Sequence, residues 1–278
     1  MKEWKPSRAA QAVAAERALL HDLGVIDDPF AAAMLGGGIR TVYAGCRRLP
    51  RRTWIRAVTL AGLAGRVRWF DREVAGSLDD GVTQVVTVGA GYDSRPWRFA
   101  RDGVRCFEID HPATQMDKRR RAPDRTSVEY VAADLIDDDV AEQLRGSSFD
   151  PDLPTVFVIE GVTMYLDEAV VRRQLGSLAS VAAPGSCLAV DFFPASRPTA
   201  GTHRRQLLLQ QVARVGSSEG FRLGVDLDDA AGLVSGCGWT TTSVVPARDA
   251  ATDLVPSGCG LPLTSVSSSK TYVAAGYQ

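Results

Sequence analysis

The segment from Val82 to Arg95 constrains the fold of this chain more than any other. Its first half is a run of β-branched residues, typical of a buried strand, and the run ends abruptly at Gly89-Ala90-Gly91. Because a glycine has no Cβ, such a loop turns sharply and lets the backbone approach a bound molecule. Asp93 or Ser94 can then cap a short helix. The order of strand, glycine loop and helix start predicts a ligand site, although Gly-Ala-Gly after a strand is also an ordinary turn.

The composition is that of a globular protein with a sizeable core. Of the 278 residues, 45% are hydrophobic and 23% are charged, and the formal net charge is −1. Basic residues are spread along the chain apart from Lys118-Arg119-Arg120-Arg121, a run typical of a solvated helix end. We therefore expect neither a nucleic-acid nor a membrane partner. No signal-peptide core and no apolar run of ~20 residues is present, which predicts a cytoplasmic protein.

The cysteines and histidines form no metal or disulfide pattern. The five cysteines are an odd number without C-x-x-C spacing, and His21, His111 and His203 stand apart from them. We predict no metal site and no disulfide framework.

The first 80 residues read as helical. Residues 7–23 are rich in alanine and leucine, with Ser7 available as N-cap. A second helical segment is expected from Asp27 until Gly36-Gly37-Gly38 closes it, and a third over residues 51–76. This layer, residues 1–80, is predicted to be a helical cap over a later site; the alternative is a plain packing layer.

From Gly81 onward strands and helices alternate, which predicts one α/β unit over residues 81–278. Such alternation is typical of a parallel sheet with helices on both faces. After residue 193 the alternation breaks, and residues 246–269 read as a loop. The expected strands are 82–88, 104–110, 128–132, 155–159, 186–192, 240–245 and 270–275, and the expected helices lie near 96–101, 113–121, 138–145, 167–181, 203–215 and 227–237.

Acidic residues end the strands that follow the glycine loop. In an open parallel sheet, ligands bind at the carboxyl ends of the strands, so these positions matter most. Asp110 lies about twenty residues after the loop, where a carboxylate can accept hydrogen bonds from both hydroxyls of a ribose. Glu108, on the same face of the strand, is the alternative. A cap of the following helix would explain Asp110 without a ligand.

Two further carboxylates complete the set. Asp134 can accept a hydrogen bond from an adenine amino group while a neighbouring N–H meets a ring nitrogen; a helix N-cap is the competing interpretation. Glu160 ends a strongly apolar strand, where an unpaired carboxylate is costly. An ammonium group or a ligand hydroxyl is its natural partner.

Four stretches together resemble one protein family. QVVTVGAGYDSRPWRF, FEIDHP, ADL and EGVTMYL are similar to motifs of the leucine carboxyl methyltransferases, a resemblance over roughly residues 10–195. It implies a Rossmann-like class I methyltransferase fold with a mostly parallel seven-stranded sheet, and S-adenosyl-L-methionine as cofactor. A dehydrogenase fits less well, because Ser94 stands where the third glycine of the dinucleotide fingerprint would lie.

The resemblance also implies residue roles. It places Gly89 and Gly91 beside the methionine part of the cofactor, Asp110 at the ribose, and Asp134 with Leu135 at the adenine. Glu160 would face the amino-acid end. The family uses two basic residues of its N-terminal helices for the cofactor carboxylate, and the matches here are Arg17 and Arg66, with Arg68 as substitute for Arg66. Without the family these would be surface arginines. The implied roles assign eight cofactor-binding residues: Arg17, Arg66, Gly89, Gly91, Asp110, Asp134, Leu135 and Glu160.

The acceptor decides the remaining chemistry. A carboxylate nucleophile is ionised at neutral pH, whereas a phenol or alcohol gains from a general base. His203 is a candidate base and Tyr165 a candidate lining residue of the methyl-transfer site; an exposed helix position and core packing are their competing explanations. We predict an O-methyltransferase acting on a small polyketide or aromatic acceptor. The alternatives are a protein C-terminal carboxyl methyltransferase and a non-catalytic adenosine-ligand-binding protein.

Overall fold

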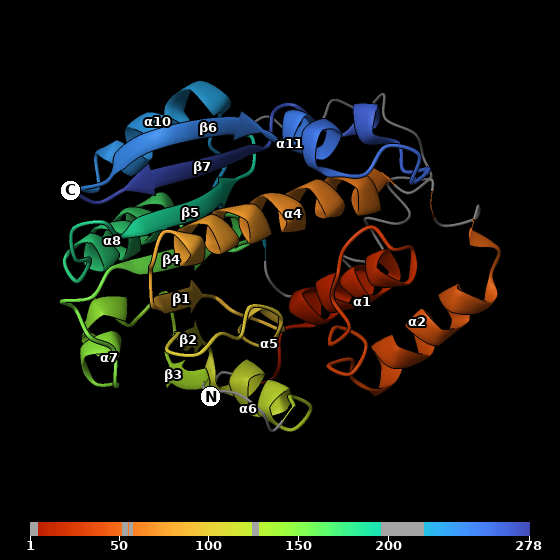
Figure 1. The fold of residues 1–278 in the computed structure, drawn as a ribbon, viewed down its shortest axis with the longest axis horizontal. Coiled ribbons are helices and arrows are strands. Elements are labelled where there is room, and N and C mark those ends of the chain that lie inside the picture. Colours follow the sequence, from red (N-terminus) through yellow and green to blue (C-terminus); the bar gives the residue numbers. More distant parts are fainter. Residues whose placement is uncertain (1–4, 52–54, 56–57, 124–127, 196–219) are drawn as a thin grey trace.

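A seven-stranded, mostly parallel sheet forms the centre of the molecule (Figure 1), as predicted. The computed structural model describes residues 5–51, 55, 58–123, 128–195 and 220–278. The strand order is β3-β2-β1-β4-β5-β7-β6, and β7 runs antiparallel to both of its neighbours. The strands are β1 (Gln84–Val88), β2 (Arg105–Asp110), β3 (Val128–Ala132), β4 (Thr155–Ile159), β5 (Cys187–Phe192), β6 (Thr240–Pro246) and β7 (Thr271–Gly276).

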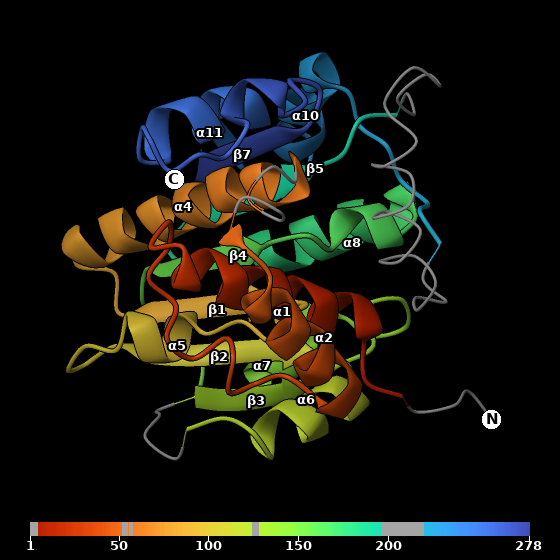
Figure 2. The same cartoon turned by 90° about the vertical axis from the view of Figure 1, so that its right-hand side faces the viewer.

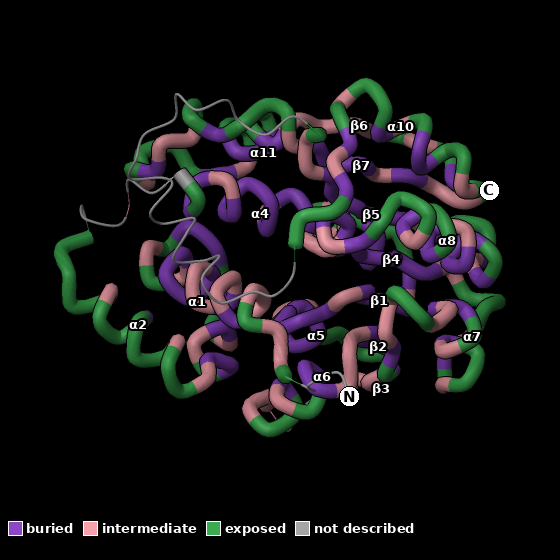
Figure 3. Tube along the Cα trace, turned by 180° about the vertical axis from the view of Figure 1, so that it is seen from behind, coloured by how far each residue is buried: buried purple, intermediate pink, exposed green. Residues whose placement is uncertain are grey.

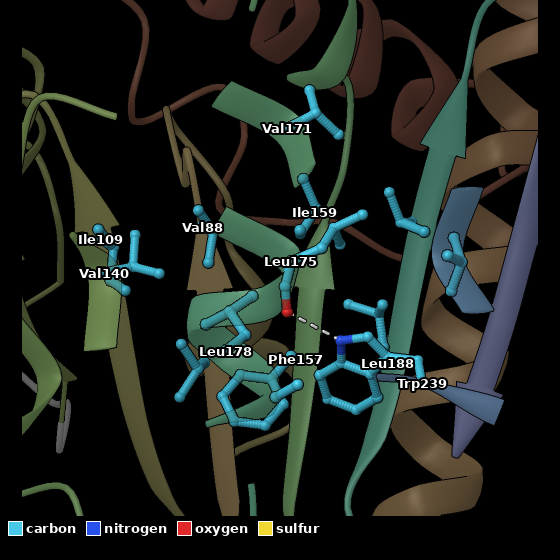
Figure 4. Close-up of a cluster of buried hydrophobic side chains, with 14 of the residues drawn as sticks. Val88, Ile109, Val140, Phe157, Ile159, Val171, Leu175, Leu178, Leu188 and Trp239 are labelled. Carbon is cyan, nitrogen blue, oxygen red and sulfur yellow. Dashed lines mark hydrogen bonds between the residues drawn. The ribbon is translucent and has the colours of Figure 1, made fainter. Parts of the chain in front are cut away.

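One face of the sheet is covered by three helices, α7 (Val140–Arg145), α8 (Glu168–Ala179) and α10 (Leu227–Ser235). Every residue of β1 and β4 is buried, because helices cover these strands on both faces. On this face Phe157 and Leu188 pack around Trp239, whose indole N–H donates to the carbonyl oxygen of Leu175 at 3.0 Å (Figure 4). The buried indole thus has the hydrogen-bond partner that its polar atom needs.

The other face packs against α4 (Val58–Asp79) and α11 (Ala247–Leu254). The helices meet closely: a Cβ added to Gly65 would lie 2.8 Å from Ala251. The expectation that residues 246–269 form a loop is therefore wrong for α11, and a single 3-10 turn, η2 (Leu263–Ser265), follows it. The helix is short, and its stability comes from burying small alanines against α4.

The N-terminal layer differs from the prediction in its second segment. Helix α1 (Arg8–Asp22) begins as expected, with Ser7 Oγ accepting from the Ala10 N–H at 3.1 Å. Residues 29–34 form turns rather than a helix, and the glycines begin α2 (Gly37–Arg48) instead of closing a helix. The reason is non-local: Asp28 is bound by side chains from elsewhere, and the Gly36 N–H donates to Gln11 Oε1 at 2.7 Å.

Helices α1 and α2 lie beyond the carboxyl ends of the central strands (Figures 1 and 2). They pack against the glycine loop and the short helix after it through a third core, in which Ala14, Ala18 and Tyr43 contact Tyr92 and Trp97. Tyr43 is the one buried residue of α2, whose outer surface is exposed (Figure 3). The division into residues 1–80 and 81–278 stays a prediction. In the described part of the chain, no helix is both long and apolar enough to cross a membrane.

Candidate cofactor and methyl-transfer site

A cavity of about 390 Å³ opens at the carboxyl edge of the sheet, under α1. Its wall combines the glycine loop, the ends of β2 and β4, and one face of α1. All eight residues predicted to bind the cofactor line it, and so does Tyr165. The structure therefore brings together residues that lie far apart in the sequence, from Arg17 to Tyr165.

The glycine loop requires glycine at both predicted positions. Gly89 has a φ of +67°, and an added Cβ would lie 2.4 Å from Val162 Cγ2. Gly91 has a φ of +52°, and its added Cβ would lie 3.0 Å from the Cβ of Ala10 on α1. Residues with a side chain rarely adopt these backbone conformations, and a side chain here would also fill the space under the helix. The loop leaves its backbone open to the cavity.

Asp110 ends β2 at the edge of the cavity. Its carboxylate accepts from the Gly91 N–H at 2.5 Å and from its neighbour's backbone N–H, that of His111, at 2.6 Å. Burial raises the pKa of Asp110, and these two N–H groups offset only part of the effect. The cap of the next helix, α6 (Pro112–Arg119), is His111, whose Nδ1 accepts from the Ala113 N–H. Helix capping therefore does not account for Asp110.

Glu108, the alternative to Asp110, has another role. Lys118 Nζ lies 2.7 Å from each of its carboxylate oxygens, and both side chains are 1% exposed. Neither residue lines the cavity. Glu108 is therefore half of a buried ion pair that joins β2 to α6.

Asp134 and Leu135, the residues predicted to contact adenine, lie in the turn after β3. Asp134 Oδ1 accepts from the Ile136 N–H at 3.0 Å, and the Asp134 N–H donates to Asp138 Oδ2. The cap of α7 is Asp139, which accepts from the N–H groups of Ala141 and Glu142. The N-cap of α7 is therefore Asp139, and the helix-cap interpretation of Asp134 does not hold.

The opposite end of the cavity is built from a continuous chain of buried ion pairs. Arg17 contacts Asp28 at 2.7 Å and Asp93 at 3.4 Å, while Arg95 contacts Asp93 at 3.1 Å and Glu160 at 2.7 Å. Arg66 Nε contacts the other oxygen of Glu160 at 2.9 Å. Among the described residues, this chain of ion pairs has five cations, Arg17, Arg66, Arg95, Arg98 and Lys270, and five carboxylates, Asp28, Asp71, Asp93, Glu160 and Asp191.

This chain of ion pairs contains as many cations as carboxylates, and such an arrangement suits a zwitterionic ligand. Burial alone would raise the pKa of Glu160, but Arg95, Arg66 and Arg17 outweigh it, so the pKa lies below its usual value. Burial and the neighbouring arginines act on Asp93 in the same way. An α-amino acid end, with one ammonium and one carboxylate, can exchange partners within such a chain without leaving an unpaired charge.

At this end of the cavity, the structure differs from the sequence analysis in the roles of three residues. Arg95 bridges Asp71, Asp93 and Glu160 and lines the cavity; the signal was its place directly after the glycine loop. Ser94 occupies the N-cap position of α5 (Arg95–Arg98), but its hydroxyl donates to Asp28 and accepts from Arg17. Arg68, the substitute for Arg66, donates to the Leu254 carbonyl and does not line the cavity.

Beyond the turn after β4, the cavity becomes more apolar. The short 3-10 turn η1 (Thr163–Tyr165) places Met164 and Tyr165 in its wall. Arg222 also lines the cavity, and its backbone N–H donates to the Met164 carbonyl. His203, the predicted base, lies outside the described residues. Among the described residues, no group of three metal-binding side chains is found.

Comparison with known proteins identifies the family. The family model for leucine carboxyl methyltransferases matches residues 8–179. A candidate S-adenosyl-L-methionine-dependent methyltransferase of Mycolicibacterium paratuberculosis is 31% identical over 262 residues, covering 86% of this chain and 84% of the relative. Another from Parafrankia is 36% identical over 137 residues, covering 47% of this chain and 44% of the relative.

Among solved structures, a candidate methyltransferase from Thermobifida fusca has a TM-score of 0.59 at 16% identity, covering 100% of this chain and 97% of the other. That likeness supports the class I methyltransferase fold. The predicted family, fold and cofactor are thus confirmed. This chain belongs to the leucine carboxyl methyltransferase family, and it is a methyltransferase that depends on S-adenosyl-L-methionine.

Proposed function

We propose that this methyltransferase transfers the methyl group to an oxygen atom of a small polyketide or aromatic acceptor. The observation that carries the proposal is the apolar extension of the cavity past Glu160. Val162, Met164, Tyr165 and Leu166 line it, next to the end where the resemblance puts the methionine part of the cofactor. A wall of this kind suits a flat, apolar acceptor with few polar groups.

The bound cofactor would supply an electrophilic methyl group on its sulfonium. The protein then has to hold the acceptor oxygen in line with the bond that breaks, and such orientation can contribute ~7–11 kcal/mol. In the proposal, Gly89 and Gly91 let the backbone approach the methionine part, while Glu160 and Arg66 bind its ammonium and carboxylate. Tyr165 lines the acceptor side.

Two carboxylates that line the cavity, Glu160 and Asp93, are poor candidates for a general base. Arginines hold the pKa of Glu160 and Asp93 below the usual range, so both remain ionised and weakly basic at neutral pH. Asp110 is assigned to the ribose. A phenol or alcohol acceptor would then require another base, and His203 remains the predicted one. An acidic acceptor would need none.

One observation favours the alternative, methylation of a protein C-terminal carboxylate: the family that matches this chain is named for leucine carboxyl methylation. A single experiment separates the two. The chain is incubated with methyl-labelled S-adenosylmethionine and, in parallel, with small phenols, hydroxylated polyketides, carboxylic acids and peptides with a free C-terminus.

Mass spectrometry then locates the label. Label on the oxygen of a small acceptor supports the proposal, and label found only at a peptide C-terminus overturns it. Replacement of Tyr165 by phenylalanine and by alanine tests the acceptor wall, because only the alanine variant removes its apolar surface. We expect Tyr165→Ala to raise the acceptor KM more than Tyr165→Phe does.

A further inference from the structure

The chain of buried ion pairs continues past the cavity and ends at Lys270, just before the C-terminal strand β7. Asp191 is the penultimate residue of β5 and is fully buried. Its Oδ2 lies 3.9 Å from Arg66 Nη1 and 3.2 Å from Lys270 Nζ. Lys270 directly precedes β7, the antiparallel strand, and its side chain is 15% exposed. The last cation of the chain thus comes from an element that does not line the cavity.

Asp191 also fixes the turn that carries Glu160. Its Oδ1 accepts from the Gly161 N–H at 2.6 Å, and its backbone oxygen accepts from the Thr163 hydroxyl at 2.7 Å. Gly161 itself has a φ of +69°, and Arg66 lies 3.2 Å from where its Cβ would be. The position of Glu160 therefore depends on the same carboxylate that Lys270 neutralises.

The surroundings of Lys270 explain why its charge matters. Its ammonium lies 3.9 Å from the ring centre of Phe193 and 5.5 Å from that of Tyr272. Three charged groups act on the pKa of Lys270: Arg66 of α4, Asp191 of β5 and Glu160 after β4. The titratable Tyr272 of β7 faces the ammonium with its ring. Burial and the repulsion of Arg66 lower the pKa of Lys270 to about 8, against the attraction of Asp191 and Glu160.

We propose that Lys270 is a positioning residue for the amino-acid end of the cofactor. It neutralises Asp191, and so leaves Arg66 and Glu160 available for the carboxylate and ammonium of the ligand. Without the Lys270 charge, the buried Asp191 carboxylate has Arg66 as its remaining cation in the described structure. Arg66 is then drawn toward Asp191 and away from the ligand.

The inference rests on the predicted placement of the amino-acid end beside Arg66 and Glu160. It needs no knowledge of the acceptor, because it can be tested by binding alone. S-adenosylhomocysteine is the probe of choice: its amino-acid end is zwitterionic and it carries no sulfonium, so a change in net protein charge acts on it only weakly. 5′-Methylthioadenosine keeps the adenosine and the thioether but lacks the amino-acid end.

Calorimetry with the two ligands gives the test. We expect Lys270→Met to weaken S-adenosylhomocysteine binding at least about fivefold and to leave methylthioadenosine binding unchanged, while Lys270→Arg restores most of the affinity. Arg101→Met is the control for loss of a cation, since the exposed Arg101 pairs with Asp79 at the surface of the described structure. Arg66→Met tests the placement itself and is expected to weaken S-adenosylhomocysteine alone.

The outcomes are separable. Unchanged S-adenosylhomocysteine binding in Lys270→Met, or equal loss of both ligands, overturns the role of Lys270. If Arg66→Met also binds normally, the placement of the amino-acid end is wrong as well. If Arg66→Met loses affinity and Lys270→Met does not, only the role of Lys270 is refuted.

The pH dependence gives a readout that needs no destabilising variant. Below pH about 8 Lys270 is charged and Asp191 is neutralised; as the pH rises through that value the charge is lost. Affinity for S-adenosylhomocysteine should therefore fall more steeply in the wild type than in Lys270→Arg, because an arginine stays charged. Titration of the ligand amino group is common to both proteins. Identical profiles between about pH 6.5 and about pH 9.5 would refute the proposal.

Discussion

The two ends of the cavity are built in different ways. At the end that we assign to the ribose, Asp110 is held by backbone N–H groups from its own strand end and from the glycine loop. At the end that we assign to the amino-acid part of the cofactor, Glu160 is held by two arginines, one from α4 and one that follows the glycine loop. The first arrangement uses local backbone; the second uses side chains that meet only when the whole fold has formed.

The difference sets the electrostatics of the two carboxylates. Burial raises the pKa of Asp110, which has no cation in direct contact among the described residues, whereas arginines lower the pKa of Glu160. A carboxylate of the first kind costs the fold free energy in its ionised form, and one of the second kind stabilises it. We therefore expect substitutions at the ribose end to affect mainly binding, and those at the amino-acid end to affect stability as well.

The largest effect is expected at Arg95. Arg95→Met removes the cation that bridges Asp71, Asp93 and Glu160, and leaves an uncompensated negative charge in a buried network. The free energy of unfolding should fall by about 3–5 kcal/mol, as for other buried pairs that lose one partner. Denaturant unfolding measures it. Arg101→Met removes a cation from an exposed pair and should lower the unfolding free energy by less than about 1 kcal/mol. Equal losses in the two variants would mean that the buried ion pairs add nothing to stability.

The next largest effect is expected on ligand affinity, from a substitution in the glycine loop, which lies between the two ends of the cavity. Gly89→Val should abolish measurable S-adenosylhomocysteine binding, a loss of more than about 100-fold, because its side chain would collide with Val162. Gly103→Val is the matched control: Gly103 also has a positive φ, +82°, but nothing lies within 4 Å of its added Cβ. That variant carries the backbone strain without the collision. Normal binding in a folded Gly89→Val protein would contradict the assignment of the loop.

A pair of neighbouring carboxylates sharpens the comparison further. Asp110→Asn should weaken S-adenosylhomocysteine at least tenfold, about 1.4 kcal/mol. Asparagine has a single acceptor oxygen, so one of the two backbone N–H groups loses its partner. This loss offsets the ionisation cost that the substitution removes, and the unfolding free energy at neutral pH should change by no more than about 1 kcal/mol. The pKa of Asp110 is raised in the folded protein. Below the unfolded pKa of about 3.9 the side chain is protonated in both states and its ionisation costs nothing; the cost appears as the pH rises through the folded pKa. An asparagine avoids this cost.

Glu108→Gln should give the reverse pattern. It leaves Lys118 buried without its carboxylate, so the unfolding free energy should fall by about 3 kcal/mol while ligand affinity is retained. Unfolding curves and calorimetry on both proteins separate stability from binding. If Glu108→Gln lost affinity and Asp110→Asn did not, the ribose carboxylate would be Glu108.

The sequence predicted the features that depend on neighbouring residues, and it missed those that depend on contacts between distant segments. The strand before Gly89, the acidic strand ends and the Ser7 cap are local signals, and they predicted seven strands and a lining that the structure brings together. Helix α11 and the turns of residues 29–34 were missed because each is stabilised by contacts with distant segments. The role of Arg95 was missed for the same reason, since Asp71 and Glu160 lie far from it along the chain.

The smallest effect is expected on the adenine side, where the turn after β3 contains several carboxylates. Asp134→Ala should weaken S-adenosylhomocysteine and methylthioadenosine equally, by about threefold, because adenine is common to both ligands and a single hydrogen bond contributes about 0.5–1.5 kcal/mol. Asp139→Ala is the control: it removes the cap of α7, which should lower the unfolding free energy by about 1 kcal/mol without changing affinity. Loss of S-adenosylhomocysteine alone in Asp134→Ala would place this residue at the amino-acid end, and would reverse the orientation of the cofactor along the cavity.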